Sequence, residues 1–264
     1  MSDSLSFDGT NLSTYGVSLV DSPIPIFAPP KIQTANIPQS HGVAVRGQYL
    51  QPRTISVDVV IEGSSFSDLL SKLDSIRALL SPSKGDKQII FDHQNTRYYL
   101  GRLENDIEVP VLGAKAIVAT LRFFCADPLG YKTTETEFVY TDGGAWDGSI
   151  TYNGSIATPI VIVGDRDTAD AVLALSVENE TTSEIIQANY ALGEGNQIKF
   201  DGDRELIEVS EDGTTWTQVM KFIDSTNRTF PMLQGGSNQL TFSGFTDTGG
   251  SEYSWTVTYR ERYL

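Results

Sequence analysis

The sequence predicts a mainly β protein of two domains: an α+β domain with one helix, then an antiparallel β-sandwich. Three observations support this. A single amphipathic helix pattern occurs in the first half, short apolar strands alternate with Gly- and Asp-rich turns elsewhere, and the pattern and charge both change near Asp127-Pro128. Strands at short intervals are typical of sandwiches. A length of 264 residues accommodates two ordinary domains.

The helix is expected between Ser65 and Pro82. Apolar residues recur there at helical spacing, so one stripe should face a core. Ser65 is suited to the N-cap, with Asp68 three residues on, and Pro82 should end the helix. The apolar stripe consists of Phe66, Leu69, Leu70, Leu73, Ile76, Leu79 and Leu80.

Strands are expected on either side of this helix. RTISVDVVI (53–61) alternates apolar and polar residues, which predicts a half-buried strand, and KQIIFD and TRYYLGRLE predict two more. KAIVATLRFFC (115–125) predicts a long strand with Leu121, Phe123 and Cys125 on one face and Arg122 on the other. The stretch 22–41 holds five prolines, so we expect an extended loop or edge segment that contacts a neighbour.

A domain junction is expected after Asp127-Pro128, because Pro128 cannot donate to a sheet. Residues 1–131 carry 11 Lys and Arg against 13 Asp and Glu (net −2), and residues 132–264 carry 8 against 21 (net −13). We therefore expect domains at 1–138 and 139–264, joined between about Tyr131 and Ser149.

The second half predicts strands only. The apolar stretches are separated by turns such as GEGN, DGDR and EDGT, and SEDGTTW (210–216) predicts a β-hairpin with an Asp-Gly turn. The expected strands lie in 158–164, 171–179, 184–192, 197–202, 205–210, 215–223, 239–244 and 252–260.

The composition excludes several classes of protein. The net charge of −15 opposes binding to phosphates. One cysteine, Cys125, excludes an internal disulfide framework and favours a reducing compartment. No apolar stretch approaches the roughly 20 residues of a membrane span, and the start of the chain lacks the pattern of a signal peptide.

The sequence offers little for catalysis. His41 and His93 stand apart, without a nucleophile elbow or zinc spacing, so no catalytic, metal or cofactor site is expected. Two acidic clusters resemble calcium loops but lack the remaining features, so solvated turns are expected. The clusters are Asp165, Asp167 and Asp170, and Asp201, Asp203 and Glu205.

The order of these stretches resembles the distal tail proteins of long-tailed, non-contractile bacteriophages. In the first half the resemblance rests on FDGTNLSTYGVSLV, PRTISVDVVIEG, FSDLLSKLDSIRALL, KQIIFDHQNTRYYLGRL and KAIVATLRFFCADPLGY. In the second half it rests on YNGSIATPIVIVG, FPMLQGGSNQLTFSG and VTYRERYL, and SEDGTTWTQVM is not among the stretches that carry it. It spans nearly the whole chain.

The resemblance implies a structural virion protein at the tail tip or baseplate, assembled in the host cytoplasm. The expected fold is a tail-tube-like β-sandwich with one helix, followed by a galectin-like β-sandwich. Six copies would form a ring that DNA passes through without specific binding or membrane insertion. Expected partners are the chain itself, the tail tube protein, the tail-tip hub and a receptor-binding protein.

Candidate residues follow for two kinds of contact. The proline-rich segment should reach a neighbouring subunit through Ile24, Ile26, Phe27, Pro29, Pro30 and Ile32. Trp146 is the candidate for stacking on a glycan, since Trp146, Trp216 and Trp255 all lie in the second half. The alternatives are a carbohydrate-binding module acting in host-surface adsorption and a hydrolase with an unrecognised motif.

Overall fold

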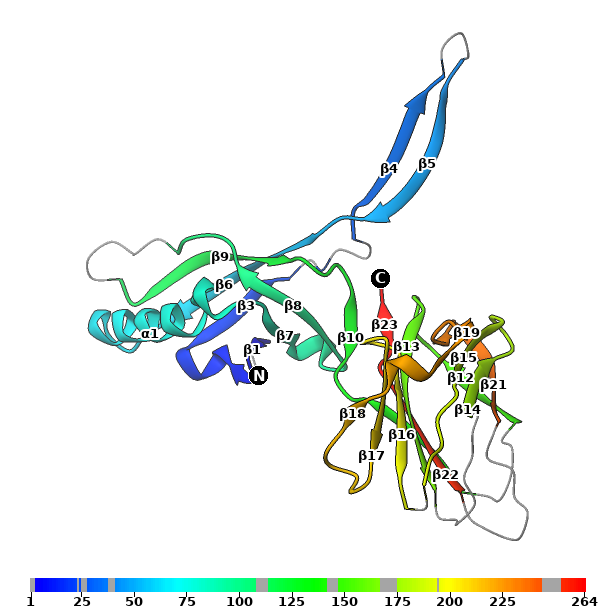
Figure 1. The fold of residues 1–264 in the computed structure, drawn as a ribbon. Helices are drawn as coiled ribbons and strands as arrows, with labels where there is room; N and C mark the ends of the chain where they lie inside the picture. Colours follow the sequence, from blue (N-terminus) through cyan, green and yellow to red (C-terminus); the bar gives the residue numbers. More distant parts are fainter. Residues whose placement is uncertain are drawn as a thin grey trace. The chain divides into compact units, whose positions relative to one another are not determined.

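The computed structural model describes residues 3–22, 24, 28–37, 41–107, 114–141, 147–166, 175–193, 195–243 and 253–264. The chain forms two compact units, Met1–Thr133 with Leu264, and Thr134–Tyr263 (Figure 1). Strand β11 (Thr136–Thr141) belongs to the second unit, because it pairs with β22 (Tyr253–Tyr259). The predicted fold class, mainly β with one helix in the first half, is confirmed for the described residues.

The first unit is an antiparallel sheet that curls back on itself. Its strand at one end, β3, approaches the start of β1, where the Leu19 backbone N donates to the Asp3 carbonyl at 2.9 Å. A curled sheet encloses its own apolar face. The order is β2 (Thr10–Asn11), β1 (Leu5–Phe7), β7 (Lys87–Phe91), β8 (Arg97–Leu103), β9 (Ala116–Cys125), β6 (Arg53–Glu62) and β3 (Val17–Asp21), and β10 (Gly130–Lys132) also pairs with β8.

The core of the first unit follows from strand alternation and one helical stripe. Every second residue of β6 is buried, and β9 pairs with it from Arg53↔Cys125 to Glu62↔Ala116. Helix α1 (Phe66–Leu79) buries Leu69, Leu73 and Ile76 in the same core. Short 3-10 turns lie at Leu12–Tyr15, Pro82–Lys84 and Asp92–Gln94.

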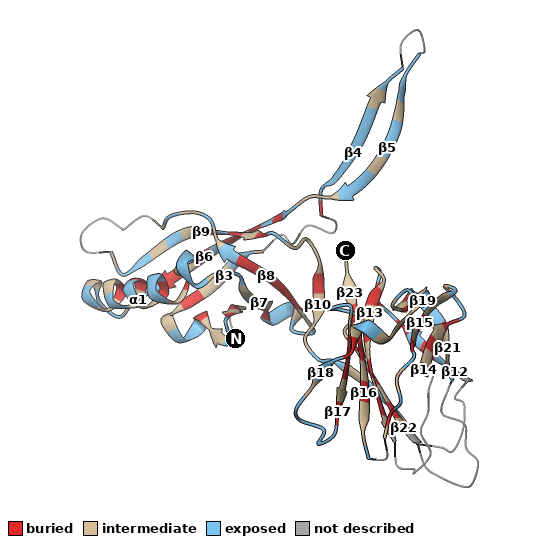
Figure 2. Cartoon of the chain, in the orientation of Figure 1, coloured by how far each residue is buried: buried red, intermediate tan, exposed pale blue. Residues whose placement is uncertain are grey.

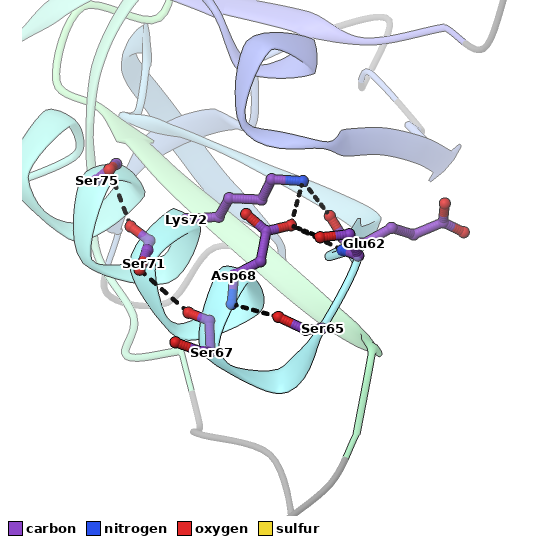
Figure 3. Close-up of polar contacts among 8 residues, drawn as sticks. Glu62, Ser65, Ser67, Asp68, Ser71, Lys72 and Ser75 are labelled. Atoms are coloured by element: carbon purple, nitrogen blue, oxygen red, sulfur yellow. Dashed lines mark hydrogen bonds and ion pairs between the residues drawn. The ribbon is translucent and has the colours of Figure 1, made fainter.

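The start of α1 is capped as predicted, with one difference. The Ser65 Oγ accepts a hydrogen bond from the Asp68 backbone N at 3.1 Å (Figure 3). The Asp68 carboxylate, however, accepts from the Ser64 backbone N at 2.7 Å, one residue before the position of a standard capping box. The Asp68 carboxylate also forms an ion pair with Lys72 at 3.2 Å. It therefore links the residue before the N-cap to the second turn of the helix.

Part of the proline-rich segment, expected to be an extended loop or edge structure, is a strand. Its second half is strand β4 (Pro30–Asn36), which pairs with β5 (Val43–Leu50) as a two-stranded hairpin. In Figure 1 this hairpin extends away from the sheet of its own unit. Pro30 is tolerated because it is the first residue of a strand whose other edge is unpaired within the described residues.

The second unit has two antiparallel sheets, as predicted for a sandwich. Trp255 and Phe242, one from each sheet, pack with ring centroids 4.6 Å apart in the core between them. One sheet has the order β11, β22, β13 (Thr158–Arg166), β16 (Gln197–Asp201), β17 (Leu206–Ser210) and β18 (Thr217–Gln218), with β20 (Met232–Leu233) beside β13. The other has β12 (Asp147–Tyr152), β21 (Gly236–Ser243), β14 (Leu175–Asn179), β15 (Glu184–Ala188) and β19 (Ile223–Arg228), and the chain also has a 3-10 turn at Met220–Phe222 and β23 (Arg262–Tyr263).

The SEDGTTW stretch forms the predicted turn between β17 and β18. Gly213 has a φ of 71°, and the Asp212 carboxylate accepts from the backbone N of Thr214 and of Thr215. These two hydrogen bonds, with the larger effect from Thr215, hold the pKa of Asp212 well below its usual range. The Asp212 side chain therefore stabilises the turn in which it lies.

Candidate assembly surface

Exposed apolar side chains gather on the hairpin of the first unit. Isolated exposed apolar residues are ordinary, whereas a group of them marks an interaction surface. Among the described residues, the large exposed apolar side chains form three groups. They are Ile32, Ile37, Val43, Val45 and Tyr49 on or beside the hairpin, Val20 and Val118 on the sheet, and Phe138 and Val139 on β11.

The register of the hairpin puts most of its apolar residues on one face. Thr34 lies opposite Val45 and Gln33 opposite Gly47, which leaves Arg46 as an extra, bulged residue. The bulge shifts the alternation by one position, so residues on both sides of Arg46 share a face. That face, called here the apolar hairpin face, consists of Pro30, Ile32, Thr34, Asn36, Val43, Val45, Gln48 and Leu50.

The opposite face of the hairpin carries no branched apolar side chain. It carries Lys31 opposite Tyr49, with the Lys31 Nζ 5.8 Å from the centre of the Tyr49 ring. Ala35 lies opposite Ala44 further along. The two faces therefore differ in character: branched apolar side chains lie only on the first, where Thr34, Asn36 and Gln48 lie among them.

The hairpin is held to its unit only at its root. The Gln51 backbone N donates to the Pro29 carbonyl at 2.8 Å, and Ala28 is buried beneath this point. Beyond the root, β4 and β5 pair only with each other within the described residues, and Figure 2 shows both strands largely exposed. An isolated two-stranded ribbon is marginally stable in water. Within the described residues, the hairpin therefore lacks a third strand or a packed element that would stabilise it.

The hairpin also differs in charge from the rest of the chain. The stretch 22–57 contains Lys31, Arg46 and Arg53 but no Asp or Glu, in a protein with a net charge of −15. Lys31 and Arg46 are exposed. A partner with an acidic surface would therefore be complementary to it.

The structure distributes the predicted contact residues between different environments. Ile32 is 55% exposed on the apolar hairpin face, and Pro29 and Pro30 are exposed near its root. Ile24 instead packs partly buried against the core of its own unit, so it does not belong to the free surface. Ile26 and Phe27 lie outside the described residues.

Sequence reasoning missed the other half of this surface. Val43, Val45 and Leu50 belong to β5, which was not expected to be a strand. The available signal was the alternation in VAVRGQYL, but Arg46 and Gly47 interrupt it because the bulge adds one residue.

The outer face of β6 and β9 is the second exposed surface of the first unit. Val118, 75% exposed, lies opposite Val60, and Asp58 lies opposite Thr120 and accepts a hydrogen bond from its hydroxyl at 2.6 Å. Glu62 is exposed on the same face, and its carboxylate points away from the helix in Figure 3. This face is named the acidic sheet face, and its exposed charged residues are Asp58, Glu62 and Arg122.

His93 and its neighbour Asp92 contact the N-terminal strands of the first unit. The His93 Nδ1 lies 2.6 Å from the Asp3 carboxylate. Asp92 accepts from the Ser4 backbone N and from the Asn11 side chain, which ties down the N-terminal strands. Over the described parts of the chain, no group of three His, Cys, Asp or Glu side chains is arranged to hold a metal ion. None of the helices described there is both long and apolar enough to span a membrane.

Neither of the two described tryptophans of the second unit has both ring faces open for stacking on a sugar. Trp255 is buried in the core. The Lys199 Nζ lies 4.3 Å from the centre of the Trp216 ring, so one face of that ring is already covered. Trp146, the candidate for a glycan contact, lies outside the described residues.

Two family models match the chain, one in each half. The first is described as a phage tail protein RIFT-related domain and matches residues 10–125. The second is described as a siphovirus-type tail component, C-terminal domain, and matches residues 153–263. No protein of curated function matches.

Two solved structures are similar to the chain at low sequence identity, and the first of them shares its fold. The Dit protein of phage SPP1, described as a paradigm of the hub adsorption apparatus in phages that infect Gram-positive bacteria, is 17% identical, with 100% of both chains covered and a TM-score of 0.79. A chain of the phage P2 baseplate in its activated conformation with calcium is 12% identical, with 100% of this chain and 99% of that chain covered and a TM-score of 0.49. The first of these likenesses extends over both units.

Proposed function

The chain belongs to the family of siphophage distal tail proteins, and we propose that it is the ring-forming hub that joins the tail tube to the tail tip. As a member of this family it is a structural component of the phage tail. The observation that carries the proposal is the apolar hairpin face, because its side chains are exposed in the single chain. A surface of this kind is stable when a partner covers it.

The proposed assembly is a closed ring. The hairpin and the body of the first unit are different surfaces, so a contact between them on two copies is heterologous. Heterologous contacts produce a ring if the rotation per subunit closes and a filament if it does not. The family resemblance supplies the number six. The hairpin of each copy would bind the body of the next.

A channel for DNA requires a wall that does not retain phosphates. The acidic sheet face is the described surface that fits this requirement, since Asp58 and Glu62 are exposed on it. Carboxylates repel phosphates, whereas affinity for DNA needs Lys and Arg in number. We assign this face to the channel. Arg122, and Arg102 opposite Phe124 on the neighbouring strand β8, are opposing charges on the same side of the sheet. The tail tube protein and the tip hub would then bind the two rims of the ring.

The second unit has a separate role in this proposal. Its sandwich core is complete without the first unit's residues, so it is available as a peripheral module for a receptor-binding protein. Assembly in the host cytoplasm is consistent with a single, buried cysteine. The protein acts by position and contact in this account, without catalysis.

Negative-stain images of the purified protein test the proposal. We expect rings with a central hole, formed by the chain alone or after addition of the tail tube protein. Images that show only compact monomers at every concentration, with and without that partner, would contradict the ring and the hub function together.

A further inference from the structure

An open cleft of about 610 Å³ lies within the second unit, at one end of its sandwich. Both sheets contribute to its lining. Glu184 comes from β15 and Arg228 from β19 of one sheet, and Glu205 comes from the turn between β16 and β17 of the other. A cleft of this size is in the range of sites that bind small molecules. It contains no residue of the apolar hairpin face or the acidic sheet face, so it is separate from the surfaces proposed for the ring.

Hydrogen bonds hold the walls of this cleft in place. The Gly202 backbone N donates to the Ile160 carbonyl at 2.9 Å. A Cβ on Gly202 would lie 2.7 Å from that oxygen, so the turn approaches β13 as closely as glycine allows. On the other wall, the Glu184 Oε2 accepts from the Met232 backbone N at 2.9 Å and from the Thr182 hydroxyl at 2.8 Å. The cleft is therefore preformed, as small-molecule sites usually are.

The cleft offers hydrogen-bonding groups that the described part of the chain does not use. The second carboxylate oxygen of Glu184, Oε1, has no hydrogen bond among the described residues. The exposed Glu205 carboxylate and Arg228 guanidinium also have no partner among them. Beside them, the Arg262 Nη2 donates to the Asp203 carboxylate at 2.9 Å. Ionised carboxylates only accept hydrogen bonds and guanidiniums only donate them, so a ligand here must offer both donors and acceptors.

Apolar side chains lie among these charged groups. Met220, Ile223, Phe230 and Met232 line the cleft, and each is only partly buried. The ring of Phe230 packs against the core of the second unit, so the ring has a supported position. A ligand with an apolar face beside its polar groups would bury that face on these side chains.

We propose that this cleft binds a saccharide. Among the described residues, the lining carries the carboxylates of Glu184, Asp203 and Glu205 and the guanidiniums of Arg228 and Arg262. A phosphate would face the carboxylates, and a simple cation would face the guanidiniums. A sugar is uncharged, and each of its hydroxyls both donates and accepts, so it satisfies both kinds of group together. Its C–H surface is suited to the apolar side chains between them.

Saturation-transfer difference NMR on the full-length protein tests the proposal, because it detects weak ligands in fast exchange. The probes are glucose, galactose, N-acetylglucosamine and rhamnose at millimolar concentration, and at least one of them should give a signal with the wild-type chain. Glu205→Gly and Arg228→Gln should each raise the dissociation constant of that sugar at least about tenfold, as expected for losing a hydrogen bond to a charged group. Glu205 has a φ of 53°, which glycine adopts without steric cost, so Glu205→Gly should leave the unfolding midpoint unchanged or raised. Loss of binding would then not come from loss of the fold.

Glu211→Gln is the matched control, because Glu211 is an exposed carboxylate beyond the other end of β17 and outside the cleft. It should bind the sugar as the wild-type chain does. Equal binding by wild type, Glu205→Gly and Arg228→Gln would place the sugar elsewhere and overturn the proposal, as would an equal loss in Glu211→Gln. A signal for glycylglycine in place of the sugars would show that the cleft takes a zwitterion, and no signal for any of the four sugars would show that it takes no saccharide. None of these outcomes bears on the ring.

Discussion

Gly16 lies where the backbone turns from the first 3-10 turn into β3, with a φ of 73°. A Cβ on this residue would lie 2.4 Å from the Glu62 carbonyl oxygen, closer than such atoms approach. The Glu62 backbone N donates to the Gly16 carbonyl at 3.0 Å, so these two segments of the chain cannot move apart without losing a hydrogen bond. Both the backbone conformation and the close approach therefore require glycine here.

We predict that Gly16→Ala destabilises the chain more than Gly9→Ala does. Gly9 also has a positive φ, 77°, but a Cβ there would meet nothing within 4 Å. Both variants should bear the cost of the left-handed conformation, about 1–2 kcal/mol, and Gly16→Ala should add the cost of the contact. Urea unfolding measures the difference. Equal losses for the two variants would show that the close approach to Glu62 is unimportant.

A second residue-scale prediction concerns the start of α1. Ser65→Ala should lower the free energy of unfolding by about 1 kcal/mol, because it removes the N-cap acceptor for the Asp68 backbone N. Ser75→Ala is the control, since the Ser75 hydroxyl only donates to the Ser71 carbonyl within the helix (Figure 3). Alanine is the better helix former, so this control should be neutral or slightly stabilising. A loss as large for Ser75→Ala would disprove the capping role.

Asp68 also gives a prediction about pH. The Ser64 backbone N–H, followed by Lys72, holds the pKa of Asp68 below its usual value. A carboxyl with a lowered folded-state pKa contributes stability above its unfolded pKa, about 4, and loses it as the pH falls through the folded value. The difference in stability between wild type and Asp68→Asn should therefore shrink below about pH 4. A difference that stays constant from pH 7 to pH 2 would contradict this assignment.

At the scale of elements, regular alternation was predictable and interrupted alternation was not. The helix at Phe66–Leu79 and the strand at Arg53–Glu62 follow from a nearly regular periodicity, which only Val60 interrupts in the strand. The hairpin was not predicted from the sequence, because five prolines lie in the stretch 22–41 and Arg46 is a bulged residue in β5. Ile24 was assigned to the contact surface because apolar character alone does not reveal which core a residue joins.

The hairpin leads to a prediction about one face of one element. Val43→Ser with Val45→Ser should abolish self-association while the single chain stays folded, since each valine is worth about 1.5–3 kcal/mol when buried. Ala35→Ser with Ala44→Ser is the matched control on the other face of the same hairpin. Sedimentation velocity measures both. Loss of association in both variants would mean that hairpin stability, and not its apolar face, is what assembly requires.

The whole molecule divides at Thr133, which allows each unit to be tested alone. Each unit has its own buried apolar cluster, so we predict that fragments 1–133 and 134–264 both fold. Fragment 1–133 should associate like the full chain, and fragment 134–264 should stay monomeric. Circular dichroism and light scattering measure the two properties. Association of fragment 134–264 alone would show that the second unit, and not the first, forms the contacts of the ring.

Copies of this chain are proposed to close into a ring through the first unit. Mass photometry of the full-length protein over a wide range of concentrations tests it most directly. The account predicts one dominant assembly of fixed mass, about 173 kDa for six chains of 28.9 kDa each, which does not grow as the concentration rises. A mass that remains at one chain throughout, or that increases without limit as in an open filament, would contradict the account.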